Sequence, residues 1–400
     1  MTTQNRLMII GAKWEQVPLI QAAKARGCFV IATDLDPAAQ GLSLADVMET
    51  LDPRDLAGAL AIARRHAVDG VTADECDYSR YAAVYVTAVL RLGKANFSAA
   101  QLTTNKRWMR ERCREQQVVQ PHFVPCHTVE EAVEAGELIG FPVIVKPVDN
   151  RGSFGVHRVD RKEDLQAAFF DAVLNAHSRE VLVEGYIEGI HVTVDGCVDQ
   201  QGRHHNLAIA TKKVTSGDKP IITEVYYPAR LSTEIVQHVF ESNSRVIEAL
   251  GITDGLTHSE YIVDAQGRCF LVEVANRGGG VLTSGKIVPA LSGVDVSALL
   301  VASAVGESFS VKFSPSGKHV MLGFFVFAPG RVMQIEGFDR AATMDGVLHV
   351  FPMIRPGQLL TPPQSGAGRH GFGIVAGNSE ADVAETFERM QSAITITYEK

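Results

Sequence analysis

Two strand-like segments in the middle of the chain each carry a glutamate, and this pair constrains the fold more than any other feature. The segments HSEYIV and CFLVEVA flank the turn-like sequence DAQG at 264–267, which predicts an antiparallel hairpin. If the loop holds an even number of residues, Glu260 and Glu273 share one face and lie about 5–8 Å apart at Cβ. A three-residue loop would put them on opposite faces. Because like charges so placed repel each other, we expect a cation between them, and oxygen ligands of this kind suit Mg²⁺.

Arg277 follows Glu273 at the point where the second strand gives way to three glycines, 278–280. A guanidinium there can stabilise charge on a transferring phosphoryl group, and the glycines let a substrate approach the backbone. Two other interpretations stay open at this point. The hairpin could be solvated with a surface arginine, or His258 and Glu260 could hold a transition metal, although no third ligand is evident.

Two further segments have the composition of nucleotide-binding elements. FPVIVKPVDNRGSFGV, 141–156, predicts a buried strand that ends at Lys146, then a glycine-rich turn whose N–H groups can reach phosphate oxygens. VLVEGYIEGIH, 181–191, predicts a strand, a crossover that begins at Glu184, and a second strand whose backbone can read an adenine. Taken alone, the first segment is also compatible with a common hairpin and the second with an exposed hinge between domains.

The N-terminal quarter alternates strand and helix, which predicts an open, doubly wound α/β sheet. The expected strands are 7–11, 28–34 and 69–72, and the expected helices are 17–26 and 57–66. A nicotinamide site is the first alternative to test, because Gly11 follows a strand and Asp34 ends the next one. The G-x-G-x-x-G pattern is missing after Gly11, so we favour an α/β domain without a dinucleotide.

The rest of the chain divides into three stretches that differ in their expected secondary structure. Residues 105–140 are expected to be helical and poor in strands. Residues 141–310 predict strands with glycine-rich turns and a helix at 234–250. From residue 320 a small strand-rich part follows, which ends in a helix at 380–393 and a last short strand. The pattern is that of one multidomain enzyme.

Composition excludes several functional classes. With 400 residues, 46% of them apolar and 21% charged, the chain can build two or three ordinary globular domains. The net charge of −8 and the lack of a basic run argue against nucleic acid or an acidic membrane as a partner. The apolar stretch near the N-terminus is too short for a signal peptide. The six scattered cysteines indicate reduced thiols, so we expect a cytoplasmic protein.

In this order and spacing, the motifs resemble the ATP-grasp superfamily over about residues 100–310. The resemblance rests on Lys106 in TTNKRWMRE, the Lys146 strand with its glycine loop, the hinge at 184–191, and the hairpin that ends at Arg277. It implies an α/β and α+β chain with an N-terminal doubly wound domain, central and lid domains, and a small strand-rich C-terminal domain. The implied boundaries are 1–105 for the N-terminal domain, 106–185 for the lid, 186–310 for the catalytic core and 311–400 for the C-terminal part of the core or lid.

The resemblance also implies a role for each motif residue. Arg277 would act at the acyl-phosphate centre, Lys146 would be the second catalytic group, and Glu260 and Glu273 would hold the metal. The implied ATP-binding residues are Lys106, Lys146, Ser153, Phe154, Gly155, Glu184, Ile187, Glu188 and His191, with His191 in the place of a ribose-binding acid and Glu188 as its alternative. The implied cofactors are ATP and Mg²⁺, with Mn²⁺ as an alternative metal. In one departure from the family pattern, Ala275 stands where many members have a further metal-binding Asn, and Asn276 comes one residue late.

Within the superfamily, the stretch 211–231 and the C-terminal segments FFVFAPGRV and GFGIVAGNS look most like the L-amino-acid (dipeptide) ligases. This implies a small-molecule carboxylate and an amine as substrates, joined through an acyl phosphate. Glu224, Gly279 and Gly280 are expected substrate contacts by position alone. A carboxylase that acts through carboxyphosphate is the main alternative, and a non-catalytic nucleotide-binding protein is a further one. The oligomeric state stays open, with a homodimer as one option.

Overall fold

The computed structural model describes residues 4–150, 152, 154–215, 221–363 and 365–399. A parallel four-stranded sheet, in the order β3-β2-β1-β4, builds the N-terminal part. Its strands are β1 (Arg6–Ile10), β2 (Phe29–Asp34), β3 (Val47–Thr50) and β4 (Gly70–Thr72), and its helices are α1 (Val17–Ala25), α2 (Leu56–Arg65) and α3 (Asp77–Leu90). The expected doubly wound α/β domain is confirmed, and its strands read as apolar runs because helices cover the sheet.

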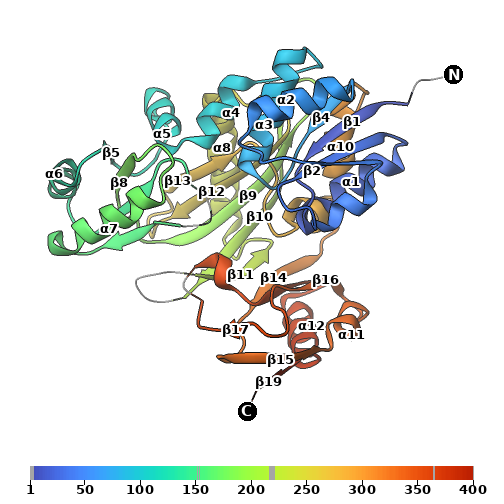
Figure 1. The fold of residues 1–400 in the computed structure, drawn as a ribbon. Coiled ribbons are helices and arrows are strands. Elements are labelled where there is room, and N and C mark those ends of the chain that lie inside the picture. The colour runs from blue at the N-terminus through green and yellow to red at the C-terminus, as the bar shows by residue number, and fades with distance from the viewer. Residues whose placement is uncertain (1–3, 151, 153, 216–220, 364, 400) are drawn as a thin grey trace.

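Two helices, α4 (Phe97–Thr104) and α5 (Lys106–Glu115), lead from this domain into a separate antiparallel sheet. That sheet has the order β5-β8-β6-β7 and forms the lobe at the left of Figure 1. Its elements are β5 (Phe123–Cys126), α6 (Val129–Ile139), β6 (Val143–Pro147), β7 (His157–Val159), α7 (Lys162–Leu174) and β8 (Val181–Gly185). Valines of the sheet and apolar residues of α6 and α7 give this lobe its own core.

One short strand, β5, lies inside the stretch 105–140, which the sequence predicted to be helical and poor in strands. The strand contains Pro125, which cannot donate a backbone hydrogen bond. It is tolerated because β5 is an edge strand that pairs only with β8.

A long antiparallel sheet forms the centre of the molecule, in the order β13-β12-β9-β10-β11-β14-β18-β16. Its strands are β9 (Ile190–Val198), β10 (His204–Val214), β11 (Ile222–Tyr227), β12 (Leu256–Val263), β13 (Cys269–Ala275), β14 (His319–Phe325), β16 (Val347–Pro352) and β18 (Gly371–Gly377). The amphipathic helix α8 (Thr233–Ala249) packs on one face through apolar residues that include Val239, Val246 and Ile247. The N-terminal domain, α9 (Val288–Ser292) and α10 (Val296–Ala304) pack on the other face.

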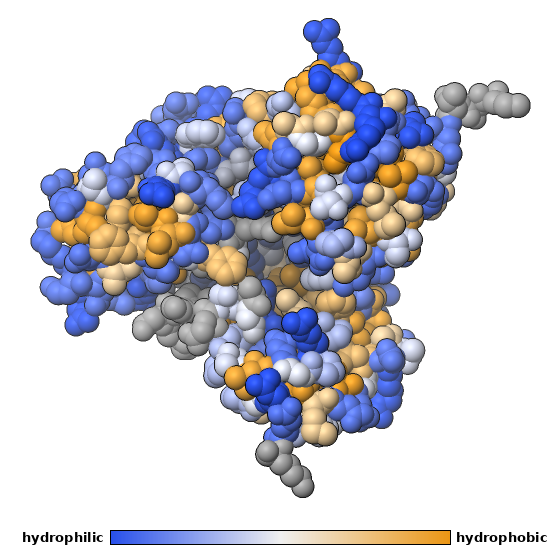
Figure 2. Space-filling view, viewed as in Figure 1, coloured by the Kyte–Doolittle hydropathy of each residue, from blue (hydrophilic) through white to orange (hydrophobic). Residues whose placement is uncertain are grey.

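The C-terminal part is divided between two sheets. Its strands β14, β18 and β16 continue the central sheet, whereas β15 (Gly330–Glu336), β17 (Leu359–Leu360) and β19 (Thr395–Tyr398) form a small sheet of their own. The helices α11 (Phe338–Ala342) and α12 (Glu380–Ser392) accompany them. Figure 2 shows the resulting lobes with an indented surface between them.

Among the described residues, no single helix is long and apolar enough to cross a membrane. One pair of segments, Thr283–Ser292 with Val296–Ala304, meets the length and composition test together but is bent by 114°.

Candidate functional site

The two central glutamates lie directly opposite each other, but not for the reason that the sequence suggested. The turn between β12 and β13 spans the five residues 264–268, since Val263 pairs with Cys269. An odd loop of this length would put Glu260 and Glu273 on opposite faces. The register slips by one residue at Val272, a β-bulge, and this slip brings Glu260 and Glu273 into register. The expected even-numbered loop is therefore wrong, whereas the expected pairing is present.

Each of these carboxylates has a lysine partner. Glu260 Oε1 lies 2.7 Å from Nζ of Lys212, a buried side chain on β10, and 3.6 Å from His258 Nε2. Glu273 Oε1 lies 3.0 Å from Lys106 Nζ, at the start of α5. Burial opposes ionisation of Glu260, yet the charge of Lys212 outweighs it and holds the pKa of that carboxyl well below its usual range. Glu260 is thus poised as an anion.

The donor set fits a hard divalent cation that a nucleotide helps to hold. No group of three or more His, Cys, Asp or Glu side chains in the described part of the chain is arranged to hold a metal alone. Mg²⁺ commonly takes one or two carboxylates and completes its shell with water and phosphate oxygens, which is what Glu260 and Glu273 can provide. Asn276 does not replace the missing amide ligand, because its side chain donates to the carbonyl oxygens of Asp254 and Leu256.

Lys146 is buried at the end of β6, as the motif suggested, and its partner is Glu184 on the neighbouring strand β8. Nζ lies 2.7 Å from Glu184 Oε2, and Arg110 of α5 contacts the same carboxylate, with Nε 2.6 Å from Oε1. Burial, together with the nearby Arg110 charge, lowers the pKa of Lys146 to about 8 despite Glu184. Burial works against ionisation of Glu184, but the two cations lower its pKa to about 2. The Glu184 side chain is therefore engaged in this ion pair, so any adenine contact falls to the backbone that follows it.

Arg277 lies beyond the carboxylate pair and is held by the N-terminal domain. Its Nε and Nη2 donate to the two carboxylate oxygens of Asp77, at 3.1 and 3.2 Å, and Nη1 donates to the Gly278 carbonyl oxygen. Burial alone would lower the pKa of Arg277, but the charge of Asp77 raises it above its ordinary value. The guanidinium is therefore permanently charged and has a fixed orientation. A group that stabilises charge on a transferring phosphoryl group needs both properties.

The glycine loop after Arg277 is held by two buried acids from the end of β4 that the sequence analysis did not single out. Asp74 Oδ1 accepts from Gly278 N at 2.8 Å, and Glu75 Oε2 accepts from Leu282 N at 3.1 Å. Burial, Glu15 and Asp74 together raise the pKa of Glu75 well above its usual value. One sequence signal could have found these acids, since ligand sites gather at the carboxyl ends of parallel strands and ADECD follows β4.

Space beside the glycine loop is limited. A Cβ atom on Gly279 would come within 2.8 Å of both Asp195 Oδ1 and His258 Nδ1. These two atoms are themselves 2.7 Å apart, and Asp195 also accepts from Tyr227 Oη at 3.0 Å. Burial works against protonation of His258, yet Asp195 raises its pKa overall. Gly279 is therefore required by close packing against a charged network, and His258 belongs to that network. Gly280 has more room, with Glu15 Oε1 3.8 Å from its notional Cβ.

The remaining predicted ATP-binding residues surround the hinge and the lid loop. Ile187 is half-buried and Glu188 is exposed at the turn into β9. Burial and the Lys212 charge both lower the pKa of His191. The strand register puts His191 on the same sheet face as Glu260, because Glu260 pairs with Thr193. Ser153 lies outside the described residues. Phe154 is 43% exposed, and Gly155 has φ +69° and packs closely against α7, so it favours glycine.

One expected substrate contact and the disfavoured nicotinamide alternative both lose support from the observed contacts. Glu224 shares its sheet face with Lys213, whereas its neighbour Val225 shares the face of Lys212, and the Glu224 carboxylate pairs with Arg230 at 3.2 Å. We therefore remove it from the proposed substrate contacts. Asp34 is not available to a ribose either, because its carboxylate oxygens accept from the backbone N–H groups of Ala12 and Asp36.

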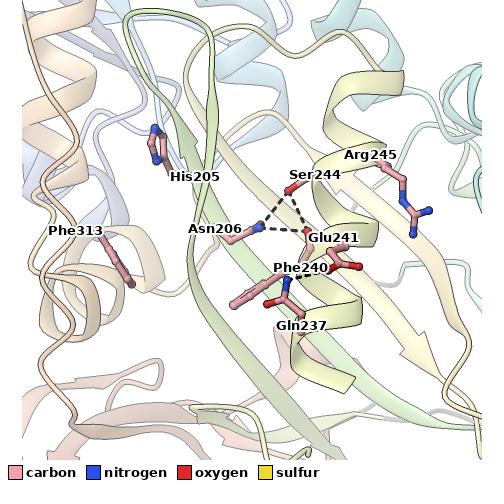
Figure 3. Close-up of a pocket in the computed structure, with 8 residues that line it drawn as sticks. All are labelled: His205, Asn206, Gln237, Phe240, Glu241, Ser244, Arg245 and Phe313. Carbon is pink, nitrogen blue, oxygen red and sulfur yellow. Dashed lines mark hydrogen bonds between the residues drawn. The ribbon is translucent and has the colours of Figure 1, made fainter. Parts of the chain in front are cut away.

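A cavity of about 650 Å³ lies elsewhere, between the start of β10, helix α8 and the segment around Phe313 (Figure 3). Six of its eight lining residues are polar in type, and Asn206 there donates to the Phe240 carbonyl oxygen and to Ser244. None of its lining residues belongs to the carboxylate, lysine and arginine constellation described above.

Comparison with known proteins finds two family matches along the chain. Residues 139–285 match the ATP-grasp domain family, and residues 323–399 match the L-amino acid ligase C-terminal domain 2. A D-alanine--D-alanine ligase of Parabacteroides distasonis is 33% identical over 153 residues, which are 36% of this chain and 45% of the relative. The chain thus spans about half the length of the curated relatives it matches.

Two solved structures share the fold over nearly the whole chain. The L-amino acid ligase from Bacillus licheniformis superposes with a TM-score of 0.85 at 21% identity, and the match covers 100% of both chains. A phosphoribosylglycinamide synthetase from Anaerococcus prevotii gives 0.79 at 19% identity over 99% of this chain and 100% of the other. At these identities the likeness concerns the fold.

Proposed function

We propose that this chain, which carries an ATP-grasp domain followed by an L-amino acid ligase C-terminal domain, is an ATP-dependent carboxylate–amine ligase. It would phosphorylate a carboxylate with ATP and then let an amine displace the phosphate, so that an amide, ADP and phosphate are formed. Free amino acids are the favoured substrates, because the C-terminal match is to the amino acid ligases. The six cysteines are free thiols, which supports a cytoplasmic location.

One observation supports this function above the others. Glu260 and Glu273 lie opposite each other, Lys106 contacts Glu273, and Arg277 follows four residues after Glu273, just past the end of β13. Such a set of charged groups can hold a triphosphate and the oxygens of a transferring phosphoryl group. Mg²⁺ bound by Glu260 and Glu273 would neutralise charge on the phosphates.

The protein's own residues would divide the work between binding and transfer. Lys106 and Lys146 would bind phosphate oxygens already in the ground state. Arg277, fixed by Asp77, would contact the equatorial oxygens on which charge spreads during transfer. No covalent intermediate with the protein is needed, since positioning and charge neutralisation account for catalysis in phosphoryl transfer.

The alternative reaction is carboxylation through carboxyphosphate, and Ala275 at the place of the usual amide ligand is the observation in its favour. A phosphate-release screen separates the two. The full chain with Mg·ATP should release phosphate only when a carboxylate and an amine, such as two amino acids, are both present. Phosphate release with bicarbonate alone would instead identify a carboxylase. Mg·ATP binding without release for any pair would refute both reactions.

A further inference from the structure

Arg369 is a half-buried cation for which the described residues offer no carboxylate partner. It lies just before β18, with Cζ 3.5 Å from the ring centroid of Phe324. Nε donates to the Gly366 carbonyl oxygen at 2.6 Å and Nη1 donates to that of Ile222 at 3.4 Å. A guanidinium carries five N–H groups, so most of its donors are unused by the described part of the chain.

Other shielded arginines of the molecule have a carboxylate partner. Arg80, Arg110 and Arg277 have side chains that are 11%, 0% and 16% exposed, and each lies against a carboxylate. Burial, with no acid in support, lowers the pKa of Arg369 to about 10. Leaving a shielded charge without a counter-ion is costly, which indicates that an anion from outside the described chain completes this site.

Arg369 lies on the same face of the central sheet as the proposed phosphoryl-transfer site. The register runs from Lys212 on β10 to Val225 on β11 and Leu322 on β14, and Phe324 follows two residues later on the same face. The two strand spacings from β10 to β14 correspond to about 10 Å, and the two residues along β14 correspond to about 7 Å. The ring that carries the Arg369 guanidinium is therefore roughly 12 Å from Lys212 in the plane of the sheet, a span that one small substrate can bridge.

A continuous set of contacts joins Arg369 to the glycine loop. Phe324 contacts Phe372, with centroids 6.5 Å apart, and Phe372 contacts Trp14 at 5.1 Å. The next residue, Glu15, accepts from Val281 N at 3.4 Å, in the loop that follows Arg277. A row of aromatic and acidic contacts thus joins Arg369 to the loop that follows Arg277.

We propose that Arg369 binds the substrate carboxylate that is not activated, namely the free carboxylate of the amino acid whose amine attacks. This rests on the proposed ligase function, in which one carboxylate becomes an acyl phosphate while the other stays anionic throughout. The planar guanidinium fork suits a carboxylate in two-point contact, and Phe324 fixes its plane. Arg369 would then be a specificity-determining residue that favours amino acids over simple amines.

The test compares the full-length protein with Arg369→Gln and Arg369→Lys, and with Arg355→Gln as a control at an exposed arginine of the same C-terminal part. Phosphate release with Mg·ATP is measured with L-alanine and L-methionine as amine components, and with L-alaninamide and L-methioninamide. Arg369→Gln should raise the KM for the amino acids about tenfold or more, the scale of a lost charged hydrogen bond. It should leave kcat, the KM for the amides and the KM for ATP unchanged, and Arg369→Lys should recover only part of the loss.

An equal effect of Arg369→Gln on amino acids and amides, or no effect on either, would overturn the inference while the ligase function stands. Absence of amine-dependent phosphate release in the unaltered protein would overturn the ligase function first, and the inference with it. The melting temperature of each variant shows whether its fold is intact. If Arg369→Gln has a fold defect, the KM for amino acids is compared with the KM for the amides in Arg369→Lys instead, because that variant keeps the charge and the apolar stem.

Discussion

Arg110 Nη2 donates to the carbonyl oxygen of Val272 at 2.9 Å, and Val272 is the bulge residue that brings Glu260 and Glu273 into register. The same guanidinium pairs with Glu184, which in turn holds Lys146. The geometry of the carboxylate pair and the position of the buried lysine are therefore fixed by one side chain of α5. The lid sheet, α5 and the catalytic hairpin meet in this network.

Glu184→Gln tests whether Glu184 holds this network or contacts the adenine. Its removal leaves Arg110 and Lys146 buried with no counter-charge, and breaking such a pair typically costs about 3–5 kcal/mol. We expect a loss of this size in urea denaturation, together with weaker ATP binding. Glu111→Gln, which removes a partly exposed partner of Arg107, is the control and should cost little. A stable Glu184→Gln protein with only weaker nucleotide binding would contradict the structural role.

The lowered pKa of Lys146, about 8, predicts a pH dependence of ATP binding. As pH rises through about 8 the free protein loses this ammonium, so ATP affinity should fall. Bound phosphates favour the charged form, so ATP binding near pH 8 should take up protons. This is measured as a dependence of the calorimetric heat on the ionisation enthalpy of the buffer. Lys146→Arg, which stays charged, should abolish the dependence, and its persistence would assign the proton to another group.

The same group predicts the sign of a stability change. Lys146 has a pKa near 10.5 when unfolded and about 8 when folded, so between these values the unfolded chain binds more protons. The free energy of unfolding contributed by this group should therefore rise with pH over that window. Urea denaturation at several pH values, in the unaltered protein and in Lys146→Arg, isolates the contribution.

Glu273→Gln should abolish ADP formation and leave the melting temperature nearly unchanged. Two opposed carboxylates repel each other, so removal of one would by itself stabilise the protein. The structure gives no reason for such a gain, because Lys106 already neutralises Glu273 and Lys212 neutralises Glu260. Glu385→Gln, on an exposed face of α12, is the matched control. Substantial turnover by Glu273→Gln would remove this residue from the proposed metal site.

Much of this arrangement could be predicted from the sequence, because some signals are local. The alternation of apolar strands and helices predicted the N-terminal domain, and the hairpin predicted a shared face for Glu260 and Glu273. The bulge at Val272 has no such signal, since it depends on Arg110 from another element. For the same reason the sequence did not predict Glu184 as the partner of Lys146, and the family resemblance placed Glu184 among the ATP-binding residues instead.

Contacts between residues of different domains or distant strands could not be predicted from the sequence either. Lys212 lies two strands away from Glu260 in the sheet, and Asp77 reaches Arg277 from the N-terminal domain. No spacing along the chain relates these pairs, because only the strand order brings them together. Pro125 lies in the edge strand β5, and a proline argues against a strand only where both edges are paired.

The final prediction separates binding from chemistry at Arg277. Lys146 would contact phosphates in the ground state, so its loss should weaken ATP binding along with rate. Arg277 would contact oxygens that gain charge only during transfer, so Arg277→Ala should lower kcat by roughly 10²-fold or more, with little change in ATP affinity. Arg277→Lys should recover little, because a point charge cannot reproduce the planar fork that Asp77 orients.

Asp77→Asn provides the matched second variant, since it keeps the shape of the partner but removes the charge that fixes Arg277. We expect it to lower kcat in the same direction by a smaller factor, and the double variant with Arg277→Ala to be no slower than Arg277→Ala alone, because the two residues act as one unit. Single-turnover phosphate release and ATP titration of each variant provide the measurement. A tenfold rise in the Kd for ATP with kcat unchanged in Arg277→Ala would make the arginine a ground-state binding residue, and the proposed position of the acyl phosphate would be wrong.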